Sequence, residues 1–281
     1  MVGSRIPGAC GEVFRDESGI LGEGGTPGSL GREPSPLDAG SGDSSDSGVE
    51  LNLVASYPKP KSWTAAKEKE LIKKGTWFPH TLDFLEVAGK GSLTIADQWD
   101  FLLKIMKAKG LIRRLNFISH GVNGQIATSG EMAEDGTSVS LDNGWTSVIS
   151  SGGTTIADPY AETWGSDGEN SGSVNVTVGD TSFTLDDVRK KFTKGAELWL
   201  YVCHGGGDPM LLKNIANTFQ VKTKGFSKVI VFCAPANFPS SRNHTVAVKT
   251  TEKDVDSCPN GVSDFRQLSS HVSTATPKKP K

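Results

Sequence analysis

Residues 198–209 read Leu-Trp-Leu-Tyr-Val-Cys-His-Gly-Gly-Gly-Asp-Pro, and this stretch decides the fold that we expect. Its first half is a continuous apolar run, which is typical of a strand buried inside a parallel sheet. The glycines then allow a sharp turn, and Pro209 suits the start of a helix that the apolar spacing predicts over Met210–Phe219. The stretch therefore predicts that a buried strand delivers Cys203 to the carboxyl edge of a sheet, where α/β proteins place their chemistry.

A second apolar strand, Leu115–Ser119, ends in a similar way on His120-Gly121. If the two strands are neighbours, their ends bring a thiol and an imidazole together. The apolar spacing before this strand predicts a helix over Ile95–Lys109, capped by Thr94, and a strand over Thr81–Val87 before that helix. This strand, helix and strand order is typical of a parallel sheet with a right-handed crossover.

The alternation of strands and helices predicts an α/β fold with a mainly parallel sheet flanked by helices. We place this domain over residues 52–270, with Lys228–Cys233 as a further buried strand. Residues 122–180 lose the helical periodicity and are expected to form a hairpin-rich insert. Residues 1–51 are expected to be a disordered acidic leader, because their Gly, Ser, Pro and acidic residues cannot bury enough apolar surface to offset the ordering entropy. A regulatory or tethering role is the alternative for this leader, and residues 271–281 read as a basic tail.

The composition of the 281 residues is that of an ordinary globular protein, with 36% hydrophobic and 22% charged residues and a formal net charge of -2. The four cysteines show no regular spacing, so neither a disulfide framework nor a zinc ribbon is indicated, and we expect reduced thiols in a cytoplasmic protein. The sequence contains no apolar run of about 20 residues and no basic-then-apolar signal pattern. We therefore expect no membrane partner. The charge balance does not argue for a nucleic-acid partner, and we expect no metal and no cofactor.

Cys203 and His120 supply the parts that a thiol nucleophile needs. Cys203 would be the nucleophile, and His120 would be the base and later the acid to the leaving amine. The backbone N–H groups of Gly121 and Cys203 would be the donors to the oxyanion. The alternative is structural, since free cysteine is among the most buried residue types and a histidine can simply end a strand. We favour a site because both residues end apolar strands and are followed by glycine within two positions.

The blocks Phe117-Ile118-Ser119-His120-Gly121 and Leu200-Tyr201-Val202-Cys203 resemble the two-block pattern of the caspase-like cysteine peptidases, a grouping that includes caspases, legumain and the CHAT-type peptidases. In that group, an apolar strand ends in His-Gly and a later apolar strand ends in the catalytic cysteine. The resemblance implies a cysteine endopeptidase that acts through a thioester on a protein or peptide substrate. It also implies that the loop at Ala234 and Pro235 contributes to the substrate pocket. A regulatory partner protein is a further expectation, and the oligomeric state is left open.

Other chemistries fit the same residues less well. His204-Gly205-Gly206-Gly207 matches the oxyanion motif of some lipases, but the chain contains no G-x-S-x-G nucleophile motif. A phosphate cradle would lack its Lys-Ser/Thr pair, and Asp208 would repel the anion. A metal site is disfavoured because adjacent strand residues such as Cys203 and His204 point to opposite faces. Two rivals to the peptidase remain, namely a non-catalytic scaffold of the same fold and a cysteine-dependent acyl transfer on a small substrate.

Overall fold

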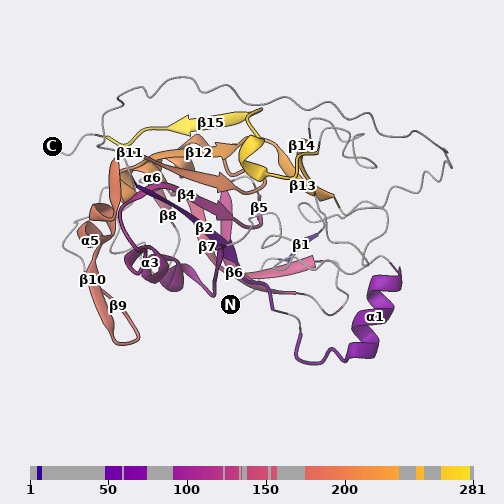
Figure 1. Cartoon of the computed structure of the whole chain (residues 1–281). Helices are drawn as coiled ribbons and strands as arrows, with labels where there is room; N and C mark the ends of the chain where they lie inside the picture. The colour runs from indigo at the N-terminus through magenta and orange to yellow at the C-terminus, as the bar shows by residue number, and fades with distance from the viewer. Residues whose placement is uncertain are drawn as a thin grey trace, which may run out of the picture.

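The computed structural model describes residues 5–7, 48–58, 60–74, 91–122, 124–132, 134, 138–150, 153–156, 175–233, 245–249 and 261–278. These residues form an α/β fold around a six-stranded, mainly parallel sheet (Figure 1). The order across the sheet is β15-β12-β11-β4-β2-β3, and only β15 runs antiparallel to its neighbour. The strands are β2 (Val49–Ala55), β3 (Leu93–Ile95), β4 (Ile112–Ile118), β11 (Phe192–Tyr201), β12 (Lys222–Phe226) and β15 (Val272–Ala275).

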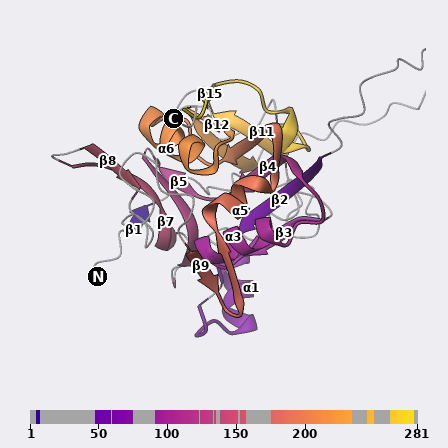
Figure 2. The same cartoon turned by 90° about the vertical axis from the view of Figure 1, so that its left-hand side faces the viewer.

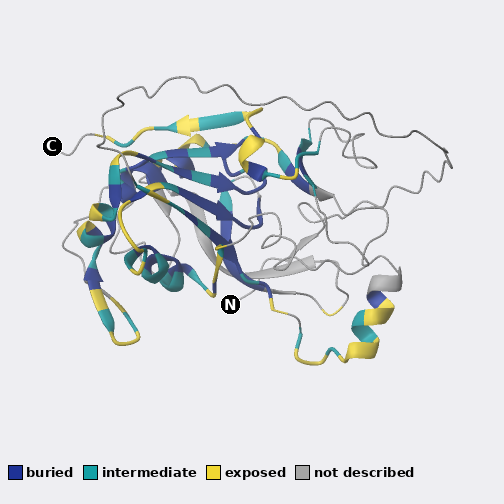
Figure 3. Ribbon diagram, in the orientation of Figure 1, coloured by how far each residue is buried: buried dark blue, intermediate teal, exposed yellow. Residues whose placement is uncertain are grey.

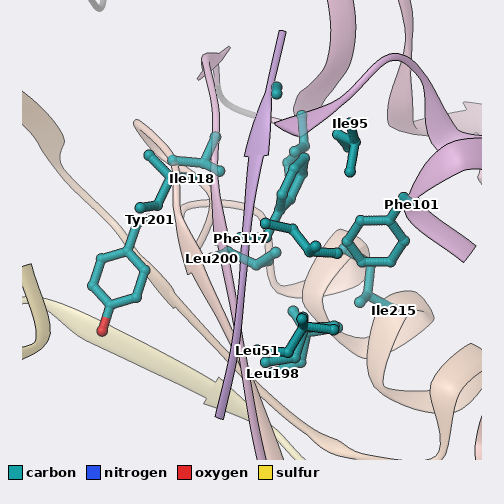
Figure 4. Close-up of a cluster of buried hydrophobic side chains, with 14 of the residues drawn as sticks. Leu51, Ile95, Phe101, Phe117, Ile118, Leu198, Leu200, Tyr201 and Ile215 are labelled. Carbon is teal, nitrogen blue, oxygen red and sulfur yellow. The ribbon is translucent and has the colours of Figure 1, made fainter. Parts of the chain in front are cut away.

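The central strands are buried because apolar side chains cover both of their faces over much of their length (Figure 3). The helices beside this sheet are α3 (Gln98–Met106), α5 (Leu185–Lys190) and α6 (Pro209–Phe219). α5 contacts both α3 and α6. The ring of Phe101 in α3 lies 5.2 Å from that of Phe117 in β4 and 6.0 Å from that of Phe219 in α6. α3 and α6 therefore share one face of the sheet, while Tyr201 lies on the opposite side of the strands (Figure 4).

Each of these helices begins where the sequence supplies a side-chain acceptor for the free N–H groups of the first turn. Asp208 accepts hydrogen bonds from the N–H groups of Met210 and Leu211, so α6 starts at Pro209 as predicted. Thr184 and Asp187 form a capping box for α5. α3 begins later than predicted, because Asp97 rather than Thr94 is its cap and residues 93–95 form strand β3.

The hairpins predicted for residues 122–180 are confirmed in the described part of that segment. β6 (Gln125–Met132), β7 (Ser138–Ser150) and β8 (Gly153–Ile156) pair in antiparallel fashion, and β9 (Asn175–Val178) pairs with β10 (Thr181–Thr184). β5 (Gly121–Val122) and β1 (Arg5–Pro7) complete the sheet of order β1-β7-β6-β5, to which β8 attaches through β7. This second sheet lies beside the central one (Figure 2). It begins directly after His120, so the insert is attached to the edge where β4 ends.

The central sheet extends beyond both expected domain boundaries. β2 begins at Val49, within the segment taken as the leader, and it pairs in parallel with β4 on one side and β3 on the other. β15 takes residues 272–275 from the expected basic tail and pairs them with β12. Apart from residues 5–7 and 48–51, the expected leader lies outside the described residues.

Of the predicted strands, the one at residues 228–233 has a different partner from the central sheet, and the one at residues 81–87 cannot be compared with the structure. β13 (Val229–Cys233) exists, but it pairs with β14 (Thr245–Lys249) as a separate ribbon, and the strand beside β11 is β12. β12 was missed because Lys222 and Lys224 make it look like a polar loop. The strand predicted over Thr81–Val87 lies outside the described residues.

Two short helices complete the description, α1 (Ala65–Lys74) and the 3-10 turn η1 (Phe265–Gln267). None of the helices in the described stretches combines the length and the apolarity needed to cross a bilayer.

Candidate active site

The strands that end in His120 and Cys203 are adjacent, parallel and in register. Leu115 pairs with Leu198, and the pairing continues to Ile118 with Tyr201. The N–H of Ser119 then donates to the carbonyl of Tyr201 at 3.3 Å, so the two chains stay together beyond the last paired residues. His120 and Cys203 each follow the last register pair by two residues. They therefore leave the sheet at the same level of its carboxyl edge, in the middle of the strand order.

Gly121 allows the two strand ends to approach each other closely. A Cβ atom at this position would lie 2.3 Å from Cγ1 of Val202 and 3.1 Å from the carbonyl oxygen of Cys203. The same atom would lie 2.8 Å from the carbonyl oxygen of Gln125 in the following hairpin. No side chain fits in this space, so glycine after His120 is required by packing alone.

His120 is buried, with 7% of its surface exposed, and it contacts Tyr57, which follows β2, and Ala127 in β6. Its backbone N–H donates to the hydroxyl of Tyr57 at 3.1 Å, and its carbonyl accepts from the N–H of Ala127 at 3.0 Å. The imidazole and the Tyr57 ring are arranged edge to face, with 4.8 Å between their centres. The backbone and ring of His120 are therefore both held by neighbours.

Cys203 is also buried, at 3% exposed, and its sulfur is disulfide-bonded. The bonded partner lies outside the described side chains. The N–H of Ile230 donates to Sγ at 3.3 Å, and the carbonyl oxygen of Ile230 lies 3.2 Å from the same sulfur. The expectation of reduced thiols is therefore wrong for Cys203, and irregular cysteine spacing gave no signal of the bond.

The glycine turn after Cys203 has a packing role that the sequence did not reveal. A Cβ atom on Gly206 would lie 2.1 Å from the carbonyl oxygen of Gly225 in β12, and one on Gly225 would lie 2.8 Å from the carbonyl carbon of Gly205. The two backbones touch, which only glycines permit. His204 adopts a left-handed conformation with φ 54°, which completes the turn.

The N–H groups of the turn are already bonded inside the protein. His204 N–H donates to Lys228, Gly205 to Val202, Gly206 to Phe226 and Gly207 to His204, at 2.8–3.1 Å. A phosphate or an oxyanion placed over these four residues would find no unused donor among them. The phosphate-cradle and lipase-type alternatives for residues 204–207 therefore lose their physical basis.

A cluster of charged side chains lies around Trp199, on the sheet face opposite to α3 and α6. Arg114 and Lys224 each lie 4.5 Å from the centre of the Trp199 ring, and Glu197 binds Lys224 and the Trp199 indole N–H. Burial alone would raise the pKa of Glu197, but hydrogen bonds from Lys224 and Trp199 outweigh it and lower this pKa. Each of these charged groups is already in contact with Trp199 or Glu197 inside the fold, so we assign them a structural role. Within the described residues, no group of three His, Cys, Asp or Glu side chains could hold a metal ion.

Ala234 and Pro235, expected to line a substrate pocket, lie outside the described residues. Two residues beside the site were not found by sequence reasoning, namely Tyr57 and Ile230. The available signal for Tyr57 was the mostly apolar segment at residues 51–55, which marks a strand that ends just before it.

Comparison of the chain with known protein families, with curated proteins and with solved structures gave no match. Its function is therefore inferred from the geometry of the two strand ends.

Proposed function

We propose that the chain is a cysteine endopeptidase with a caspase-like fold, in which Cys203 is the nucleophile and His120 the general base. The observation that supports this most directly is the register of β4 and β11, which brings His120 and Cys203 out at the same level of one sheet edge. Gly121 also packs closely against the backbone carbonyl of Cys203, so the two chain segments expected to supply the oxyanion donors lie next to each other.

The reaction would proceed in two halves. His120 takes the thiol proton of Cys203, and the thiolate adds to the peptide carbonyl to give an oxyanion stabilised by the N–H groups of Gly121 and Cys203. The tetrahedral adduct collapses to a thioester as His120 returns its proton to the leaving amine. A water molecule, deprotonated by His120, then adds to the thioester, and the carboxylic acid leaves as the thiol is restored.

This chemistry requires that the disulfide at Cys203 be opened first, since a disulfide sulfur carries no nucleophilic electron pair of thiolate strength. A dithiol reductant would supply two electrons and two protons, giving the Cys203 thiol and its partner thiol, and would itself become a disulfide. The N–H of Ile230 already points at Sγ and would help to stabilise the thiolate once it forms. The oxidised form is then a resting state of the enzyme.

A non-catalytic scaffold or interaction module of the same fold is the second candidate. The observation that favours it is the bond itself, because a buried disulfide at 3% exposure is typical of a structural cross-link. In this case the cysteine stabilises the fold, and its removal affects stability rather than a reaction.

The two candidates are separated by labelling with a panel of peptidyl acyloxymethyl ketones, which react with activated thiolates. After treatment with a dithiol, the wild-type chain should be labelled, and Cys203→Ala and His120→Ala should not. His204→Asn is the matched control, because His204 follows Cys203 directly but its Nδ1 lies 3.2 Å from the Ser227 carbonyl oxygen, and asparagine tolerates its left-handed backbone. This variant should be labelled like the wild type.

The pH dependence of Cys203 alkylation by iodoacetamide is a second test of the two candidate functions, and it needs no substrate. A paired thiolate should titrate below the ordinary thiol value of about 8.5, and His120→Ala should move the midpoint upward. The scaffold candidate is supported if the reduced wild type is labelled by no ketone and its thiol titrates as an ordinary one.

A further inference from the structure

Tyr57 contacts His120 but has no part in the proposed mechanism. It follows β2 by two positions and is buried, with 2% of its surface exposed. Its hydroxyl accepts a hydrogen bond from the backbone N–H of His120 at 3.1 Å and lies 2.8 Å from the hydroxyl oxygen of Ser119. Its ring stands edge to face against the imidazole. Tyr57 therefore contacts both the backbone and the side chain of the proposed base.

The direction of each hydrogen bond in this group follows from its acceptors. The Ser119 hydroxyl donates its only proton to the carbonyl of Ala127 in β6, with the His120 carbonyl at 3.3 Å as a weaker acceptor. The Ser119 oxygen must then accept the proton of Tyr57. Because the phenol proton is used in this way, the Tyr57 oxygen presents its lone pairs to the His120 N–H. The chain of bonds runs from His120 through Tyr57 and Ser119 to β6.

The same network keeps its protons over the range in which the enzyme would act. Burial raises the pKa of Tyr57 to about 12, and the hydrogen bonds to Ser119 and His120 offset only part of this effect. The phenol therefore remains a neutral donor at neutral pH. On the other side of the strand end, the N–H of Ala127 binds the His120 carbonyl. His120 is thus fixed at once by Tyr57, which follows β2, and by β6.

We propose that Tyr57 is a positioning residue, whose hydroxyl fixes the backbone of His120 and whose ring fixes the orientation of its imidazole toward Cys203. This role rests on the proposed function, because it matters only if His120 is the base. A base displaced by a fraction of an ångström loses much of its effect, since proton transfer depends steeply on geometry.

The test compares Tyr57→Phe with Tyr201→Phe in the reduced, full-length chain. Both tyrosines are buried, and both hydroxyls are hydrogen-bonded, but the Tyr201 hydroxyl binds the Arg114 guanidinium at 2.7 Å on the sheet face away from α3 and α6. Tyr57→Phe should slow ketone labelling about tenfold and raise the midpoint of the alkylation pH profile. Tyr201→Phe should change neither the labelling rate nor the midpoint.

Ser119→Ala gives a second route if Tyr57→Phe fails to fold. It leaves the bond from His120 to Tyr57 in place but removes the acceptor of the phenol proton, so labelling should slow by a smaller factor in the same direction. An unchanged alkylation midpoint in both variants overturns the positioning role, as does an equal effect of Tyr57→Phe and Tyr201→Phe.

Failure of the proposed function has a different signature. If His120→Ala leaves wild-type labelling unchanged, then His120 is not the base and both proposals are wrong. If His120→Ala abolishes labelling while Tyr57→Phe matches the wild type, only the role of Tyr57 is wrong.

Discussion

Tyr57 and Tyr201 are two buried tyrosines with raised pKa values. Burial raises the pKa of Tyr57 and of Tyr201 to about 12, and for Tyr201 the nearby Arg114 offsets part of this rise. The folded state thus holds each phenol proton more tightly than the unfolded chain does, whose tyrosines titrate near 10. The stabilisation is complete below about pH 10 and is lost as the pH rises toward 12.

We therefore expect the free energy of unfolding to fall steeply between about pH 10 and 12, by up to about 3 kcal/mol for each tyrosine. Urea denaturation in steps across this range measures the effect. Tyr57→Phe has no phenol at this position, so its stability should fall by a smaller amount over the same range. Equal slopes for the wild type and Tyr57→Phe would show that Tyr57 does not titrate in this way.

At the scale of elements, the turn between β11 and α6 depends on backbone contact with β12. Gly206 and Gly225 lie so close that neither position has room for a Cβ atom. This turn also sets the start of α6, where the Asp208 side chain caps the first N–H groups of the helix. The position of Cys203 is thus coupled to β12, a strand outside the two that carry the proposed dyad.

Gly206→Ala should destabilise the protein by roughly 3 kcal/mol, because the new methyl group collides with the Gly225 backbone rather than with a movable side chain. Gly179→Ala is the matched control. Gly179 has φ +58 and open space around its Cβ position. The alanine variant should therefore lower the free energy of unfolding by only about 1 kcal/mol, through backbone strain. Chemical denaturation of both variants gives the comparison, and similar losses would mean that the contact with β12 relaxes easily.

At the scale of the whole molecule, the last described strand protects the edge of the central sheet. β15 pairs with β12 over four residues, and the N–H of Lys278 beyond it donates to the side chain of Asn217 in α6 at 2.9 Å. The C-terminal segment therefore joins the sheet to the helical layer. Without it, β12 would present an unpaired edge, which invites association with another chain.

A chain that ends after His271 should be less stable than the full chain and should self-associate through β12. A chain that ends after Lys278 keeps the strand and the contact to α6, and it should behave like the wild type. Thermal unfolding and light scattering measure the two effects. If both truncated chains match the wild type, β15 contributes little to the edge.

Several features were predictable from local sequence because their physical cause is local. The apolar run up to Val202 and the one up to Ile118 mark buried strands, and Pro209 with Asp208 marks the start of α6. The hairpins of the insert followed from turn residues between short Thr and Val segments. The neighbouring positions of β4 and β11 also agree with the prediction, which placed His120 and Cys203 at one edge.

Other features were decided only by tertiary structure. β12 is a strand although it alternates lysines with Thr223 and Gly225, because Lys222 and Lys224 bind Glu197 on β11 while the intervening residues face inward. The disulfide at Cys203 and the bonds between Tyr57 and His120 join positions far apart in the chain. The sequence by itself determined which segments are buried and where helices start, because periodicity and capping act over a few residues. Strand pairing, the state of Cys203 and the setting of His120 depend on long-range contacts, and these exist only once the chain has folded.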